Sequence, residues 1–252
     1  MRIASPAILS FLMLIILSST ATAGDPLGGC NETHRDTLNT LRACDVVIGR
    51  QDTHKAVRLQ AFQIRGKAHL AAGNITAALA DFTTVINALP MGKLKGYVLY
   101  LRGQSRFDYT EKTPASLKAS VGDLEVANDL APDNPRIMET LAKAYSVAGR
   151  HEDALRVAST VIQLNPRTLT AFRVRAASHE ALGRNREAIL DLNTLIDRKL
   201  RDAELLTWRG RLHEKRRNAH QALADYRNAA RVETTDDLLA GIKRMEKLLG
   251  LE

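Results

Sequence analysis

The sequence lacks the short motifs that most often mark catalysis or nucleotide binding. Its 252 residues contain no G-x-S-x-G, no P-loop and no G-x-G-x-x-G. The two cysteines have no histidine partner at a suitable position, and no other nucleophile is paired with a base. We therefore expect a non-catalytic protein without a cofactor.

Runs of β-branched residues are scarce, and low-complexity segments and flexible linkers are absent. Alanine and leucine are abundant, and everything after Asn31 has the pattern of helices separated by short Gly, Asn or Pro punctuation. The sequence therefore predicts an all-α fold.

The first 23 residues are organised like a secretory signal peptide. Arg2 precedes a mostly apolar stretch, 3–17, which is shorter than the roughly 20 residues of a membrane-spanning helix. Ala21-Thr22-Ala23 then matches an A-x-A cleavage site. We expect residues 1–23 to be removed and the mature chain to be secreted across the inner membrane as a soluble periplasmic protein.

A second processing signal overlaps the first. Leu27-Gly28-Gly29-Cys30 resembles the site at which a bacterial lipoprotein is cut and acylated, but Asp25 and Pro26 fall inside the cleavage region. Cys30 and Cys44 are the only cysteines, and an even count in an exported chain suggests pairing. We predict a Cys30–Cys44 disulfide, with lipid anchoring at Cys30 as the alternative.

An internal repeat runs through most of the chain. Pro132 and Pro166 are 34 residues apart, and so are Gly149 and Gly183. Aligning the chain on these marks gives five units, marked by Phe62, Gly66, Gly73, Ala78, Phe82 and Pro90; Leu99, Gly103, Leu124, Ala127 and Pro132; Tyr145, Gly149, Ala154, Ala158 and Pro166; Phe172, Ala176, Gly183, Ala188 and Leu192; Leu206, Gly210, Ala222, Tyr226 and Ala229.

This pattern resembles the tetratricopeptide repeat, a helix–turn–helix unit of 34 residues. The resemblance implies a right-handed superhelix, or solenoid, of about five stacked repeats, with small residues at helix crossings and large ones between neighbouring pairs. We expect residues 24–60 to form an N-terminal segment with a leading helix from Asn31 to Arg50. The repeat domain would span 61–234, and 235–252 would form a capping helix.

Two units depart from the pattern. The second carries an insertion around "YTEKTPAS", where Thr113 is placed to cap a helix starting at Pro114. The fifth has Arg217 at the turn position and lacks the closing proline.

Comparison of the units suggests an internal ion pair. Four units have Arg before the small residue of the first helix and Asp before the large residue of the second. The third unit has Leu141 and Val157 instead. We predict structural pairs in which removal of one partner costs several kcal/mol, namely Arg65–Asp81, Arg102–Asp123, Arg175–Asp191 and Arg209–Asp225.

The histidines do not suggest a metal site. His69, His179 and His213 occupy one repeat position, and successive units lie too far apart to share an ion. His213-Glu214 lacks the second histidine of a zinc-protease motif, because Arg217 stands there. We expect packing histidines and no metal.

The net charge of +8 comes partly from basic runs at 184–186, 198–201 and 214–217. Acidic residues are interleaved with these runs, so a solvated face is the simplest interpretation. Nucleic acid is not expected for an exported chain with only Trp208 nearby for stacking. Anionic lipid or cell-envelope polymer is the alternative partner.

The resemblance places the first helix of each unit along the groove. Aromatic and cationic side chains on that face are typical of protein interfaces. We therefore expect an adaptor or assembly factor that binds a protein or an extended peptide. The candidate groove residues are Gln63, Lys67, Tyr97, Tyr100, Gln104, Phe107, Arg136, Lys143, Arg173, Trp208, Arg211 and Lys215.

Overall fold

A computed structural model describes residues 27–31, 36–198 and 202–251, which form twelve helices and no strand. The predicted signal peptide, 1–23, lies outside these residues. The helices are α1 (Thr37–Gly49), α2 (Lys55–Ala71), α3 (Ile75–Ala88), α4 (Lys93–Tyr109), α5 (Pro114–Leu130), α6 (Pro135–Val147), α7 (His151–Leu164), α8 (Leu169–Ala181), α9 (Asn185–Arg198), α10 (Ala203–Lys215), α11 (Ala219–Ala230) and α12 (Asp236–Leu249).

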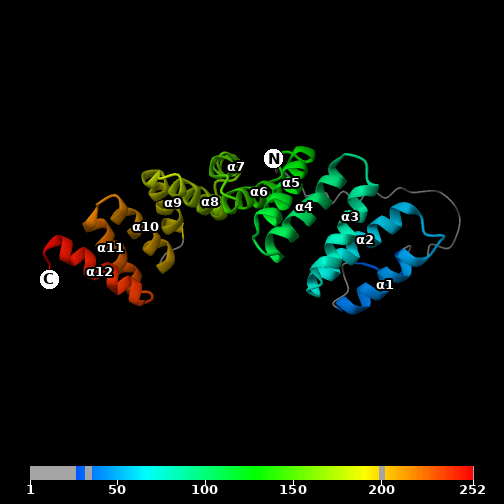
Figure 1. Ribbon diagram of the computed structural model, residues 1–252, viewed down its shortest axis with the longest axis horizontal. Coiled ribbons are helices and arrows are strands. Elements are labelled where there is room, and N and C mark those ends of the chain that lie inside the picture. The colour runs from blue at the N-terminus through cyan, green and yellow to red at the C-terminus, as the bar shows by residue number, and fades with distance from the viewer. Residues whose placement is uncertain (1–26, 32–35, 199–201, 252) are drawn as a thin grey trace, which may run out of the picture.

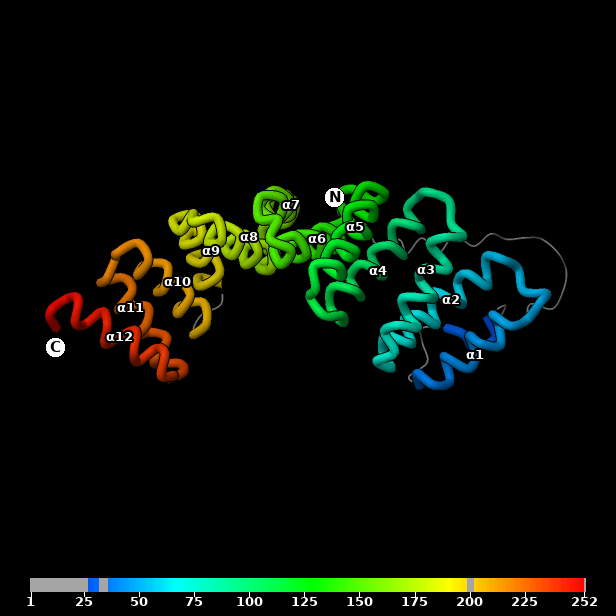
Figure 2. Tube along the Cα trace, viewed as in Figure 1, coloured from blue at the N-terminus to red at the C-terminus, as the bar shows by residue number. Residues whose placement is uncertain are grey.

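The helices follow one another in an elongated row from α1 at one end to α12 at the other (Figures 1 and 2). Five helix pairs, α2–α3 to α10–α11, form the units, with α1 before them and α12 after them. Each helix packs against the next in the chain. The predicted all-α solenoid is therefore confirmed. Within the residues that the structure describes, no helix is long and apolar enough to cross a membrane.

Turn chemistry explains where the helices stop and start. Gly73, Gly149 and Gly183 have φ near +75°, in the left-handed region that glycine adopts without strain. Arg217 holds the same position in the fifth unit at φ 61°. Thr113 accepts a hydrogen bond from the Ser116 backbone N–H and so caps α5 as predicted.

Small residues allow the two helices of each unit to approach closely. A Cβ added to Gly66 would lie 2.7 Å from the Phe82 ring, and one added to Gly210 would lie 2.7 Å from Tyr226. Both rings are almost fully buried. A side chain at either glycine would therefore push the two helices apart.

Element boundaries differ from expectation in two places. The leading helix begins at Thr37 rather than Asn31, because Asp36 caps it by accepting hydrogen bonds from two backbone N–H groups. The first repeat helix begins at Lys55, before the expected boundary at 61. The insertion in the second unit accompanies long helices on both sides of a short connection: α4 and α5 have 17 residues each, the same length as α2.

The described segment 27–31 is joined to α1 by a disulfide between Cys30 and Cys44. Both cysteines are fully buried, with Val47, Ala61 and Ile64, in a cluster between α1 and α2. The bond therefore attaches the segment before α1 to the first layer of the solenoid.

Candidate binding groove

The first helices of successive units lie next to each other. α4 contacts α6 and α6 contacts α8, in addition to the contacts within each pair. We call the surface formed by α2, α4, α6, α8 and α10 the inner face. All twelve candidate groove residues come from these five helices, and seven of them line two cavities.

The first cavity lies between α4 and α6 and has a volume of about 660 Å³. Tyr97 and Tyr100 contribute their rings, whose centroids are 6.4 Å apart, and Lys67 Nζ lies 5.3 Å from the centroid of Tyr97. Gln104 and Arg136 also line it. Burial raises the pKa of Tyr100, so its hydroxyl stays protonated well above neutral pH. We call this cavity the α4–α6 pocket.

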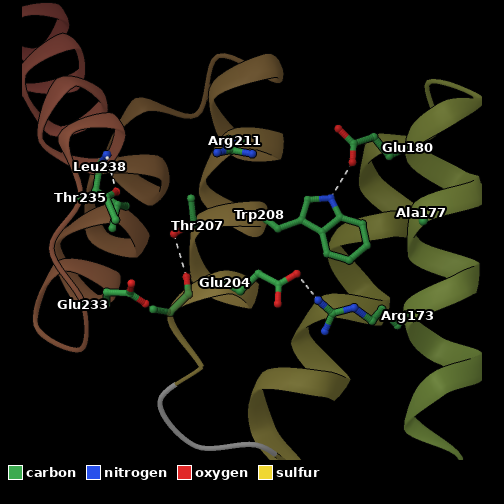
Figure 3. A pocket seen from close by; sticks show the side chains of 11 residues that line it. Arg173, Ala177, Glu180, Glu204, Thr207, Trp208, Arg211, Glu233, Thr235 and Leu238 are labelled. Carbon is green, nitrogen blue, oxygen red and sulfur yellow. Dashed lines mark hydrogen bonds and ion pairs between the residues drawn. The ribbon is translucent and has the colours of Figure 1, made fainter.

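The second cavity, of about 570 Å³, lies between α8, α10 and the start of α12 (Figure 3). Trp208 stands in its centre and donates its indole N–H to Glu180 Oε2 at 2.5 Å. Arg173, on the same helix as Glu180, forms an ion pair with Glu204 of α10. Arg211 lines the same cavity and makes no ion pair with any described residue. We call this cavity the α8–α10 pocket.

The remaining candidates lie outside the two cavities. Lys215 pairs with Glu180 at 2.5 Å, beside the α8–α10 pocket. Phe107 is partly buried, packs against the core cluster that includes residues of α5 and α6, has Lys112 over its ring, and lines neither cavity. Gln63 and Lys143 are half-buried on α2 and α6.

Sequence reasoning missed the acids of the inner face. Glu180 accepts hydrogen bonds from both Trp208 and Lys215, and Glu204 pairs with Arg173. These contacts connect α8 with α10. The spacing of these residues, close to one repeat length, was the signal that would have found them.

The four predicted Arg–Asp pairs lie beneath this surface. In each, the arginine Nε and Nη2 donate to the two carboxylate oxygens at 2.6–2.9 Å. Each aspartate is buried, whereas each arginine keeps part of its surface exposed. The bidentate geometry fixes the two helices of a unit relative to each other.

Each of these arginines also reaches the helix that precedes its own unit, which is α1 for Arg65 and the second helix of the preceding unit for the other three. Within the preceding unit, the acceptor stands two residues after the position that the paired aspartate occupies in most units. The contacts are Arg65–Asp45, Arg102–Thr83, Arg175–Ser159 and Arg209–Asn193. In the third unit Leu141 replaces the arginine. Glu125 of the preceding layer then accepts from the Tyr145 hydroxyl and from Arg150 Nη1. Every layer is therefore joined to its predecessor by a polar contact at this place.

The titratable residues near the groove do not form a metal site in the described part of the chain. No group of three or more His, Cys, Asp and Glu side chains there is placed to hold a metal ion. Burial lowers the pKa of His179 and of His213 below the ordinary value of 6.5. These repeat-equivalent rings are thus neutral packing groups at neutral pH.

The sequence matches no protein-family profile and no curated protein. Solved structures do match its fold. The C-terminal part of a TPR repeat-containing protein from Cytophaga hutchinsonii is 14% identical, with a TM-score of 0.65 over 82% of this chain and 81% of that one. MamA of AMB-1 is 17% identical, with a TM-score of 0.61 over 74% of this chain and 98% of that one. A tetratricopeptide repeat protein from Parabacteroides merdae is 16% identical, with a TM-score of 0.50 over 83% and 77%. Together with its own helix pairs, these matches show that the chain has the tetratricopeptide-repeat fold.

Proposed function

We propose that this protein is a non-catalytic scaffold that binds an extended segment of another protein on its inner face. The observation that carries the proposal is the pair of cavities on that face. Each combines aromatic surface with an arginine that makes no ion pair with a described residue: Tyr97 and Tyr100 with Arg136, and Trp208 with Arg211. Aromatic and arginine side chains supply most interface hot spots.

The proposed location is the bacterial periplasm. The signal-peptide pattern at 1–23 supports export, and the buried Cys30–Cys44 disulfide suits an oxidising compartment. Acylation of Cys30 would use the same sulfur as the disulfide, so the lipid-anchored alternative requires Cys44 to be left as a free thiol. The proposed division of the chain remains a signal peptide, an N-terminal segment with α1, a repeat domain and the cap α12.

The proposal is tested by crosslinked capture from the native envelope fraction. The bait variant Tyr97→Ala/Arg211→Ala removes one exposed group from each cavity. The matched control, Leu190→Ala/Arg186→Ala, removes an exposed apolar group and an arginine from α9, a second helix. A discrete protein that is lost with the first variant and kept with the control supports the scaffold. A partner that both variants retain contradicts it.

The second candidate is an envelope-binding module that recognises anionic lipid or polymer. It rests on exposed arginines near the turns after α8 and α10, namely Arg186, Arg216 and Arg217. None of these three forms an ion pair with a described residue. Binding through them would weaken steeply with salt, whereas binding led by aromatic groups would not. Loss of binding with Arg186→Ala and not with Tyr97→Ala would favour this candidate.

A further inference from the structure

The two halves of the inner face differ in how their polar groups are used. On α8 and α10, Arg173, Trp208 and Lys215 are each bonded to a glutamate of the neighbouring first helix. These side chains hold successive units together, so a ligand that bonded them would have to break contacts between layers. Of the four candidates on α8 and α10, only Arg211 makes no side-chain hydrogen bond or ion pair with a described residue.

The α4–α6 pocket carries a single kind of charge. Arg136 is the one charged residue that lines it, and no acid lines it. The α8–α10 pocket, by contrast, is lined by Glu180, Glu204 and Glu233 as well as by arginines. An unpaired arginine beside apolar surface favours a carboxylate, because guanidinium and carboxylate form two parallel hydrogen bonds.

The surroundings of the pocket are also cationic. Lys143 lies two helical turns after Arg136 on α6, hence on the same side of the helix, and Lys67 approaches the pocket across the Tyr97 ring. Acids also lie in this region, and the exposed Asp133 directly precedes Asn134, which lines the pocket. Glu139 accepts a hydrogen bond from the Thr170 hydroxyl at 2.7 Å, and Asp108 is exposed near the end of α4.

The pocket offers a different contact to each part of a peptide. The half-exposed ring of Tyr97 presents a face for an aromatic or aliphatic side chain. The Gln104 amide can both donate to and accept from a peptide backbone. Arg136 lies across the cavity from α4, in the first turn of α6.

We propose that the α4–α6 pocket recognises an acidic extended protein segment, in which an aspartate or glutamate side chain pairs with Arg136 and a neighbouring aromatic or aliphatic side chain packs on Tyr97. This inference rests on the proposed function and specifies the partner's chemistry. The carboxylate belongs to a side chain within the segment and not to the end of a chain.

The test is selection from a library of random octapeptides displayed on phage without a free carboxyl terminus. The purified protein is compared with Arg136→Gln and with the control Arg186→Gln, which removes an equal charge from α9. The expected pool from the unaltered protein is enriched in Asp or Glu next to large apolar residues, and Arg186→Gln selects the same pool. Arg136→Gln loses the acidic enrichment. The best peptide should bind Arg136→Gln about 10-fold or more weakly, as expected for loss of a charged hydrogen-bonded contact.

Three outcomes would overturn the inference: a pool without acidic enrichment, an acidic pool that Arg136→Gln still selects, or no enriched pool. The scaffold proposal is judged separately. A neutral pool whose binding depends on Tyr97 leaves the scaffold standing and removes only the acidic partner. Binding that is indifferent to both Tyr97 and Arg136 removes the inner-face scaffold as well.

Discussion

The pair formed by Arg175 and Asp191 gives the sharpest prediction about stability. Asp191 has a side chain only 4% exposed and receives hydrogen bonds of 2.9 and 2.6 Å from Arg175, which is 25% exposed. Arg175→Leu leaves a buried carboxylate without its cation and should cost about 3–5 kcal/mol. Asp191→Val leaves a guanidinium that can turn towards water, so we expect a smaller loss of about 1–3 kcal/mol.

The double variant Arg175→Leu/Asp191→Val copies the third unit, where Leu141 and Val157 are both buried in the core. We expect it to lie within about 1 kcal/mol of the unaltered protein, because a well-packed apolar pair can replace a buried ion pair at little cost. Urea unfolding followed by helical circular dichroism measures the four stabilities. Hydrogen exchange in α8 and α9 localises the effect, since solenoid layers can unfold separately. A double variant as unstable as Arg175→Leu would refute the reasoning.

Three further predictions concern other parts of the chain. Arg217→Gly should stabilise the protein by about 1 kcal/mol, because Arg217 has a left-handed backbone at φ 61° and three other units have glycine at this position. An unchanged or lower melting temperature would contradict this. Cys30→Ala/Cys44→Ala should lower the free energy of unfolding by about 3 kcal/mol, as expected for a closed loop of this length. Proteolysis before α2 should become faster, whereas hydrogen-exchange protection of α8 to α11 should not change. A uniform loss of that protection would show that the layers are not independent. Stability should fall as pH drops below 6.5, because the folded pKa of His179 and of His213 lies below the unfolded value and the unfolded chain therefore takes up protons first. His179→Met/His213→Met should lose less stability than the unaltered protein between pH 7.5 and 5.5, and equal losses would assign the effect to other groups.

The helix pairs were predictable because the repeat compares the chain with itself. Gly66 and Gly210 occupy equivalent positions, and both face a ring that leaves no room for a Cβ. The same comparison identified Arg175 and Asp191 as partners, since both are replaced together in the third unit. Covariation between the repeats of this chain thus predicted a contact in three dimensions.

Contacts between layers were harder to predict. The bond from Arg209 to Asn193 depends on how far one unit is rotated relative to the next, which no single unit encodes. The helix start in the second unit, by contrast, was predictable, because Thr113 followed by Pro114 is a typical N-cap and first helical residue.

The groove candidates were selected by their position in the repeat alone, and position does not show whether a side chain is already bonded to a neighbouring residue. Trp208 and Arg173 lie on the expected face, but each is bonded to an acid of the neighbouring first helix. Phe107 lies one turn beyond Gln104 yet packs against the core cluster. Only the arrangement of the neighbouring layer separates side chains that hold the solenoid together from those that face a ligand.

The most direct test of the scaffold proposal is site-specific photo-crosslinking in the native envelope. A photoreactive phenylalanine replaces Gln104, which lines the α4–α6 pocket, and in a matched variant it replaces Leu190, which is 59% exposed on α9. Binding on the inner face predicts a discrete crosslinked protein from position 104 and none from position 190. Equal crosslinking from both positions, or crosslinking from position 190 alone, would contradict it.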